Sequence, residues 1–167
     1  HAGKWLIIYD DGFNYLTKMC LVNMREACFD MIRYAHSKGC RIAISSSDAT
    51  DHWKEYLDQG ADYIMIGEAE QTVSELTAGG ESVSDVANIP GLAYQDKGAF
   101  LRTAPRSVLR NLDELPAPAW DLVDTAAYRR RWMERHGYFS LNVATTRGCP
   151  FKCNWCAKPI YGNRYNA

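Results

Sequence analysis

The hydrophobic pattern of the first 80 residues alternates between two periods. Apolar runs at 5–9, 41–46 and 62–66 have the length and the β-branched or aromatic content of buried strands. Between and after these runs, apolar positions recur every three or four residues over 22–37, 51–58 and 70–78, which is typical of amphipathic helices. Glycines follow these segments at 39, 60 and 79–80, as expected where helices end.

Strands that alternate with helices in units of this length predict a parallel sheet with right-handed crossovers. We therefore expect an α/β fold with a partial Rossmann-like (flavodoxin-like) sheet over 1–79. A doubly wound domain usually has five or six strands, and the pattern supplies three. Either earlier strands are missing from this chain, or the chain forms a small three-stranded domain.

The pattern changes over 80–137. Residues 89–94 and 99–102 flank the polar segment 95–98, which predicts a β-hairpin. Pro105, Pro116 and Pro118 then punctuate an irregular linker, and a short helix is expected over 124–135. The arginines of that helix are interpreted as a solvated face. Residues 139–145 form an expected strand that begins the last segment, 138–167.

Composition narrows the class of protein. The 167 residues carry a net charge of −1 and 47% hydrophobic residues, so we expect neither a nucleic-acid partner nor binding to an anionic membrane. No apolar run approaches the ~20 residues of a membrane span, and no signal peptide is recognised. Six cysteines in a long α/β chain do not indicate a disulfide scaffold. We expect a reducing, cytoplasmic location.

Three of the cysteines are clustered after the expected strand 139–145. Cys149, Cys153 and Cys156 have the spacing C-x3-C-x2-C, which places three thiolates on one tight loop. Zinc usually takes four ligands, and a self-contained ferredoxin site would need a fourth cysteine. The spacing therefore favours an iron–sulfur cluster with one open iron, and a zinc site remains the alternative.

This loop resembles the signature of the radical S-adenosylmethionine (SAM) superfamily. The matching residues run from Thr145 to Cys156 and include Trp155 before the last cysteine. The resemblance implies that Cys149, Cys153 and Cys156 hold a [4Fe–4S] cluster, that SAM chelates the open iron, and that one electron cleaves SAM to a 5′-deoxyadenosyl radical. It also implies that Trp155 lies beside the adenine and that the loop follows the first strand of a partial (β/α) barrel.

The upstream half is similar to the cobalamin (B12)-binding subgroup of that superfamily. Residues 60–72 resemble its G-A-D-x-x-x-x-G-E-x-E-x-T segment, and residues 89–92 and 112–121 resemble its linker into the barrel. The cobalt-ligating D-x-H-x-x-G signature is absent, because His52 lacks the glycine. Cobalamin is therefore an implied, possible cofactor. Its expected contacts follow two strand ends, where open α/β sheets bind ligands. They are Ser45, Ser46, Ser47, Gly67 and Glu68.

Taken together, these features predict a fragment of a radical SAM enzyme that is cobalamin-dependent and catalyses methyl transfer or related radical chemistry. No catalytic side chain is assigned. The resemblance implies a small-molecule or unknown substrate and an electron donor such as flavodoxin or ferredoxin. A barrel needs roughly 200 or more residues, so we expect the chain alone to be catalytically incomplete. The alternative is a non-enzymatic zinc- or iron–sulfur-binding interaction module.

Overall fold

The structure is a computed structural model, and it describes residues 4–9, 20–79, 83–141, 146–148, 151 and 165–166. The chain divides into two compact units, His1–Val108 and Leu109–Ala167. The first unit holds an α/β sheet domain, and the second holds short helical elements and a small two-stranded sheet.

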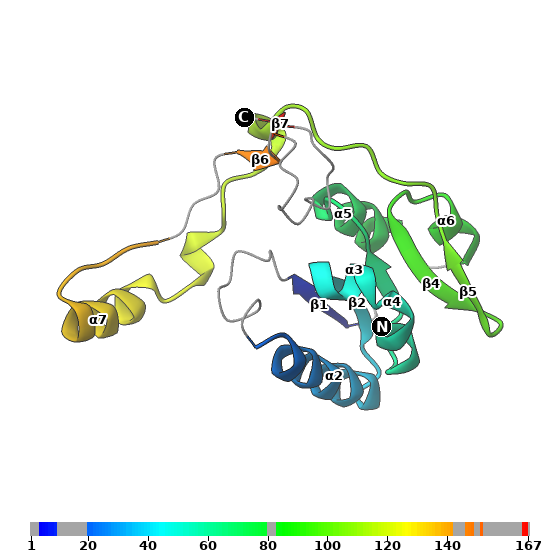
Figure 1. Ribbon diagram of the computed structural model, residues 1–167, viewed down its shortest axis with the longest axis horizontal. Coiled ribbons are helices and arrows are strands. Elements are labelled where there is room, and N and C mark those ends of the chain that lie inside the picture. The colour runs from blue at the N-terminus through cyan, green and yellow to red at the C-terminus, as the bar shows by residue number, and fades with distance from the viewer. Residues whose placement is uncertain are drawn as a thin grey trace. The chain divides into compact units, whose positions relative to one another are not determined.

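A five-stranded mixed sheet forms the first unit, with the strand order β1-β2-β3-β4-β5 (Figure 1). The first three strands are parallel, as the sequence predicts, and β4 and β5 are antiparallel to their neighbours. The strands are β1 (Trp5–Tyr9), β2 (Arg41–Ser45), β3 (Tyr63–Met65), β4 (Leu92–Asp96) and β5 (Ala99–Arg102).

The predicted hairpin is confirmed, but it does more than link two domains. Its first strand pairs with β3 in the register Ile64↔Ala93, so the hairpin extends the sheet. Lys97 and Gly98 form its turn with φ values of 47° and 81°. Two consecutive left-handed residues are typical of the two-residue turns whose twist matches that of paired strands. The fold is therefore α/β with a sheet that is only partly parallel.

The helices of the first unit connect these strands. The predicted helices over 22–37 and 70–78 are confirmed as α2 (Leu21–Ser37) and α5 (Glu70–Gly79). The helix predicted over 51–58 begins earlier and is interrupted at His52, which gives α3 (Ser47–Asp51) and α4 (Trp53–Asp58). A short helix that the sequence analysis did not predict, α6 (Val83–Ala87), precedes the hairpin.

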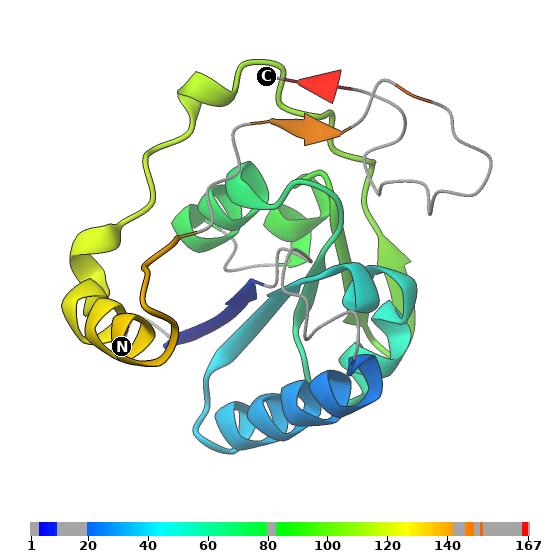
Figure 2. The same ribbon diagram turned by 60° about the vertical axis from the view of Figure 1, so that its left-hand side comes forward.

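Two apolar cores lie on opposite faces of the sheet. Figure 2 shows the helices on the two sides, with α2 in blue on one side and α5 in green on the other. On one face, Ile42, Ile44 and Ile64 pack with α2, α3 and α4. On the other, Ala43 and Met65 pack with α5 and α6. The alternation along each strand explains this division, because successive strand residues point to opposite faces. Because β2 and β3 are parallel, the segments that follow these two strands lie at the same end of the sheet.

The second unit has less buried surface. It contains the 3₁₀ helices η1 (Leu112–Glu114) and η2 (Trp120–Leu122), α7 (Thr125–His136), and the antiparallel pair β6 (Arg147–Gly148) and β7 (Tyr165–Asn166). The helix predicted over 124–135 is confirmed as α7, capped by Asp124, which accepts a hydrogen bond from the Ala127 amide at 2.8 Å. None of the described residues of this second unit is buried.

The strand predicted over 139–145 is not tested as a whole. Residues 139–141 have no strand assignment, and 142–145 lie outside the described residues, so the barrel strand stays a prediction. Within the part of the chain that is described, no helix has the length and hydropathy to cross a membrane.

Candidate functional site

The junction between β2 and α3 contains the three serines that the sequence analysis assigned to a ligand. Ser46 is the N-cap of α3, and its hydroxyl oxygen accepts a hydrogen bond from the Ala49 amide at 2.9 Å. This cap explains why the helix begins at Ser47 rather than at residue 51. Ser45 ends β2 and is buried. The Ser46 hydroxyl is thus engaged in capping, whereas Ser47, the first residue of α3, is exposed.

A buried ion pair lies beneath this loop. The Arg25 guanidinium donates to both carboxylate oxygens of Asp48, at 2.7 Å from Nε and 2.5 Å from Nη2. The Tyr56 hydroxyl donates to Asp48 Oδ2 at 2.7 Å. The Asp48 side chain is 5% exposed, so the carboxylate is almost fully removed from water. The three groups tie α2, α3 and α4 together.

The electrostatics of Asp48 reflect two opposed effects. Burial alone raises the pKa of its carboxyl, but the hydrogen bonds from Arg25 and Tyr56 and the positive charge of Arg25 outweigh burial and lower it below its ordinary 3.8. Burial and the bond to Asp48 raise the pKa of the Tyr56 hydroxyl. The carboxylate therefore stays ionised at neutral pH. Sequence reasoning missed this ion pair, because Arg25 and Asp48 are 23 residues apart and match no local motif.

The loop after β3 lies beside the loop after β2. Ala43 is paired with Tyr63 and Ile44 with Ile64, and parallel strands end at the same edge. Gly67 has φ +87°, and no described heavy atom lies within 4 Å of the position of a Cβ. Glu68 is buried, 6% exposed. The structure thus brings the predicted positions together at neighbouring strand ends, while their contact with cobalamin stays a prediction.

The carboxyl end of β1 contributes to the same edge. The Tyr9 hydroxyl donates to Glu70 Oε1 at 3.2 Å, which connects β1 with the start of α5. A cavity of about 220 Å³ opens near this end of β1 and β2. Its lining includes Ile8, Tyr9, Leu21, Met24, Ser46 and Asp48. Its wall is mainly apolar, and the ion-paired Arg25 and Asp48 also contribute to it.

Two other residues of the segment 60–72 have structural roles. The Asp62 carboxylate accepts a hydrogen bond from the Ile42 amide at 2.7 Å, which fixes β3 beside β2. Burial raises the pKa of Asp62, and the bond from Ile42 partly offsets that effect. Thr72 is fully buried, and Arg106 Nε donates to its hydroxyl oxygen at 2.7 Å. Arg106 also forms an ion pair with Glu75 and so anchors the chain after the hairpin to α5.

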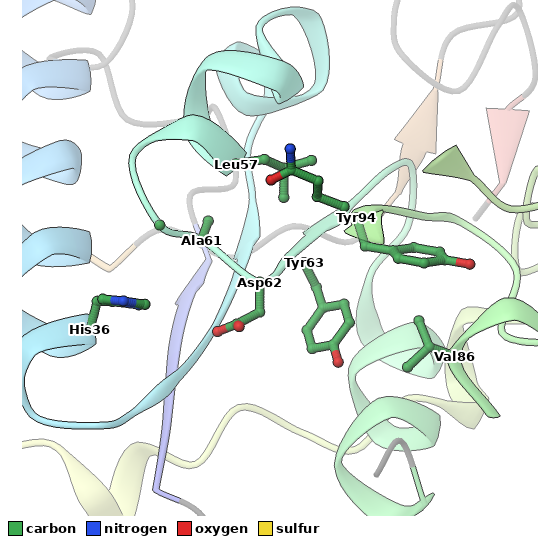
Figure 3. Close-up of a pocket in the computed structure, with 9 residues that line it drawn as sticks. His36, Leu57, Ala61, Asp62, Tyr63, Val86 and Tyr94 are labelled. Carbon is green, nitrogen blue, oxygen red and sulfur yellow. The ribbon is translucent and has the colours of Figure 1, made fainter. Parts of the chain in front are cut away.

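A second cavity, of about 240 Å³, lies at the opposite end of β3 (Figure 3). His36, Asp62, Tyr63 and Tyr94 line it together with Leu57 and Val86. None of the residues assigned to a ligand from the sequence contributes to its wall. It faces the amino ends of the strands, whereas open α/β sheets bind ligands at the carboxyl ends, so the smaller cavity is the better candidate.

The predicted cluster ligands lie outside the described residues. This holds for Cys149, Cys153 and Cys156, and also for Trp155. Within the described part, no group of three histidine, cysteine or acidic side chains is arranged to hold a metal ion. The described cysteines, Cys20, Cys28 and Cys40, form no disulfide. The metal centre and the SAM contact therefore stay predictions from the sequence.

Comparison with known proteins gives a consistent, distant similarity. No family model matches the chain. The chain is 32% identical over 105 residues (62% of its length) to an uncharacterized methyltransferase of Pyrococcus horikoshii. It is 30% identical over 118 residues (70% of its length) to the anaerobic magnesium-protoporphyrin IX monomethyl ester cyclase of Synechocystis. A second uncharacterized methyltransferase, also of Synechocystis, is 26% identical over 136 residues, 81% of the chain.

These relatives are much longer than the region of similarity. The matched regions span 22%, 23% and 21% of the three proteins, respectively. The chain is therefore distantly homologous to one part of proteins named as methyltransferases and a cyclase.

Proposed function

We propose that this chain is part of a cobalamin-binding radical SAM enzyme that transfers a methyl group or carries out related radical chemistry. The C-x3-C-x2-C spacing of Cys149, Cys153 and Cys156 is the observation that carries the proposal. Distant homology to two proteins named as methyltransferases and to one named as a cyclase supports it. The substrate, a small molecule or one of unknown class, is proposed to make its contacts outside this chain.

In this proposal the second unit of the chain holds the cluster and SAM, and the first unit binds the corrin. The thiolates of Cys149, Cys153 and Cys156 hold three irons of a [4Fe–4S] cluster, and Trp155 packs against the adenine of SAM. Bound together, the cluster and SAM supply a one-electron reductive cleavage that starts radical chemistry. An electron donor such as flavodoxin or ferredoxin provides the electron. The resemblance to the radical SAM loop supports each of these roles.

The carboxyl-end edge of the sheet is proposed to bind the corrin. The open space at Gly67 lets a flat ligand approach the backbone, because no Cβ stands in its way. Ser45, Ser47 and Glu68 supply polar groups beside it, and the Ser46 cap together with the Asp48 ion pair keeps the loop in place. Cobalamin, when bound, supplies a methyl carrier. These residues fit such a ligand by position and by the room at Gly67.

Anaerobic reconstitution with ferrous iron and sulfide tests the cluster. We expect the broad visible absorbance of a [4Fe–4S] centre, and an electron paramagnetic resonance signal after reduction that changes when SAM is added. Cys149→Ala, Cys153→Ala and Cys156→Ala should each abolish the bound cluster. Cys20→Ser is the matched control, because Cys20 is an exposed free cysteine outside the loop and should retain full iron content.

A colourless protein with one zinc per chain and no response to SAM would sink the proposal. It would instead favour the second candidate, a non-enzymatic zinc-binding interaction module. A cluster that forms but does not respond to SAM would support an iron–sulfur module without SAM chemistry.

Titration with hydroxocobalamin tests the proposed corrin site. It should show a spectral shift that Gly67→Val removes, because a valine side chain fills the open space.

A further inference from the structure

The loop between β3 and α5 carries two of the positions proposed for the corrin site. It contains Gly67, where a φ of +87° leaves open space beside the backbone, and Glu68, which is 6% exposed. β3 ends at Met65 and α5 begins at Glu70, so the loop 66–69 belongs to neither a strand nor a helix. The contacts at its two ends therefore help to determine its conformation.

The turn at Pro90 and Gly91 holds both ends of this loop. At the start of the loop, the Ile66 amide donates a hydrogen bond to the Gly91 carbonyl at 2.7 Å. After the loop, in the first turn of α5, the Thr72 hydroxyl donates to the Pro90 carbonyl at 3.3 Å. Thr72 is fully buried. One turn thus fixes the chain on either side of the loop.

Arg106 joins that turn to α5 from the segment that follows the hairpin. Its Nε donates to the Thr72 hydroxyl oxygen at 2.7 Å and lies 3.3 Å from the Pro90 carbonyl oxygen. Its Nη1 and Nη2 both donate to the carboxylate of Glu75, one helical turn farther along α5. The Arg106 side chain is 9% exposed, whereas the residues before and after it are exposed. This one side chain therefore anchors its segment.

The packing around Gly91 connects these contacts closely. A Cβ at Gly91 would lie 3.0 Å from the Ile66 carbonyl oxygen, 3.2 Å from Arg106 Cβ and 3.4 Å from Thr72 Oγ1. The loop, the helix and the segment after the hairpin thus meet around one glycine. Because closely packed groups transmit displacements, a change at Arg106 is expected to shift Ile66, the residue before Gly67.

We propose that Arg106 is a positioning residue of the corrin site and that it acts through the Thr72 hydroxyl on the loop 66–69. This inference rests on the function proposed above. Arg106 keeps the loop in the conformation that leaves the backbone of Gly67 open to a flat ligand. The bond to Thr72 is the stronger route, because it is buried. The Glu75 side chain is 47% exposed, so water screens its ion pair.

Titration of two Thr72 variants with hydroxocobalamin tests this route. Thr72→Val removes the hydroxyl and keeps the shape of the side chain, so the Kd for hydroxocobalamin should rise about tenfold. Thr72→Ser restores the hydroxyl and should return the Kd to within about threefold of wild type. Gly98→Ala is the control for lost stability alone, because it strains the hairpin turn at a φ of +81° without touching the loop.

Arg106→Lys separates geometry from charge. Lysine keeps a positive charge near Glu75, but one ammonium group cannot reproduce the planar fork that bonds Thr72 and both Glu75 oxygens. The Kd should therefore rise about tenfold, which also keeps the proposal testable if Thr72→Val does not fold. Arg33→Lys is the matched control, because Arg33 pairs with Asp30 on the exposed side of α2. It should change the Kd less than about twofold.

Nuclear magnetic resonance of the cobalamin-free chain gives a second readout. The amide signals of Gly67 and Glu68 should move in Thr72→Val and in Arg106→Lys and return toward their wild-type positions in Thr72→Ser. The amide signal of Ile44, in the core on the other face of the sheet, should stay in place. A shift of the Ile44 signal as large as that of Gly67 would indicate a general loss of structure and contradict the proposal.

The titrations separate failure of this inference from failure of the proposed function. If the wild-type chain binds hydroxocobalamin and the Thr72→Val and Arg106→Lys variants bind it within about threefold, the role of Arg106 is overturned and the corrin site stands. If Gly98→Ala raises the Kd as much as these variants do, lost stability explains the effect and the role is also overturned. A wild-type chain without any spectral shift overturns the corrin site itself, and this inference with it.

Discussion

The two units of the chain differ in two respects: one buries the apolar cores that stabilise a fold, and the other carries the cysteines of the proposed chemistry. The sheet unit, 1–108, buries two apolar cores and a carboxylate paired with arginine. In the unit 109–167, the described residues include strongly exposed apolar side chains, such as Leu122 at 82% and Phe151 at 72%. Yet the three clustered cysteines belong to this second unit. Stability and the proposed redox chemistry are therefore separable, and single substitutions can test that separation.

The largest effect is expected at the buried ion pair of the sheet unit. Asp48→Ala leaves the largely buried Arg25 without its bidentate partner and should lower the free energy of unfolding by about 3 kcal/mol. Urea unfolding followed by far-ultraviolet circular dichroism measures it. Asp30→Ala is the control, because the Asp30–Arg33 pair is exposed and contributes less than about 1 kcal/mol. Equal effects of the two substitutions would mean that burial of Asp48 adds nothing to stability.

The same ion pair predicts a pH dependence. The pKa of Asp48 is lower in the folded than in the unfolded protein, so its stabilising effect is present above the ordinary pKa of 3.8 and is lost as the pH falls through the lower, folded-state pKa. Urea unfolding at neutral pH and down to about pH 3 should show the stability gap between wild type and Asp48→Asn narrowing toward acid. A gap that stays constant with pH would contradict the assigned ionisation.

A smaller effect is expected at the junction of β3 and the hairpin. Gly91 has φ +79°, and a Cβ there would lie 3.0 Å from the Ile66 carbonyl oxygen and 3.2 Å from Arg106 Cβ. Gly91→Ala should therefore cost about 2 kcal/mol. Gly98→Ala is the matched control, because Gly98 has a similar φ of +81° with no described atom within 4 Å of a Cβ. Gly98→Ala should lower the free energy of unfolding by about 1 kcal/mol. The difference between the two variants therefore measures the effect of the steric contact at Gly91.

The smallest effect is expected in the second unit. Leu122→Ala removes a side chain that is 82% exposed and should change the free energy of unfolding of the sheet unit by less than about 0.5 kcal/mol. Cys149→Ala should likewise leave the free energy of unfolding of the unreconstituted protein unchanged in urea, although it is expected to abolish cluster binding. A loss above about 1 kcal/mol for either variant would show that the units are thermodynamically coupled.

Part of this architecture is determined by local pattern. The apolar runs at 5–9, 41–46 and 62–66 and the helical periods between them predict the β-α-β order, because burial on a sheet or a helix imposes periods of 2 and 3.6 residues. Gly39 ends α2 as its position predicts, with φ +70° and a hydrogen bond from its amide to the His36 carbonyl at 2.9 Å. The cysteine spacing is also a property of the sequence alone, and the structure adds nothing to it.

Other features depend on contacts between distant residues. That the hairpin extends the sheet follows from the pairing of β4 with β3, because local turn chemistry specifies a hairpin but not its neighbour. The Arg25–Asp48–Tyr56 group and the Arg106–Thr72 bond join residues 8 to 34 positions apart. No periodicity encodes such pairs. The sequence thus determined most of the strands and helices and the proposed metal ligands, whereas only tertiary packing decided which polar side chains are buried together.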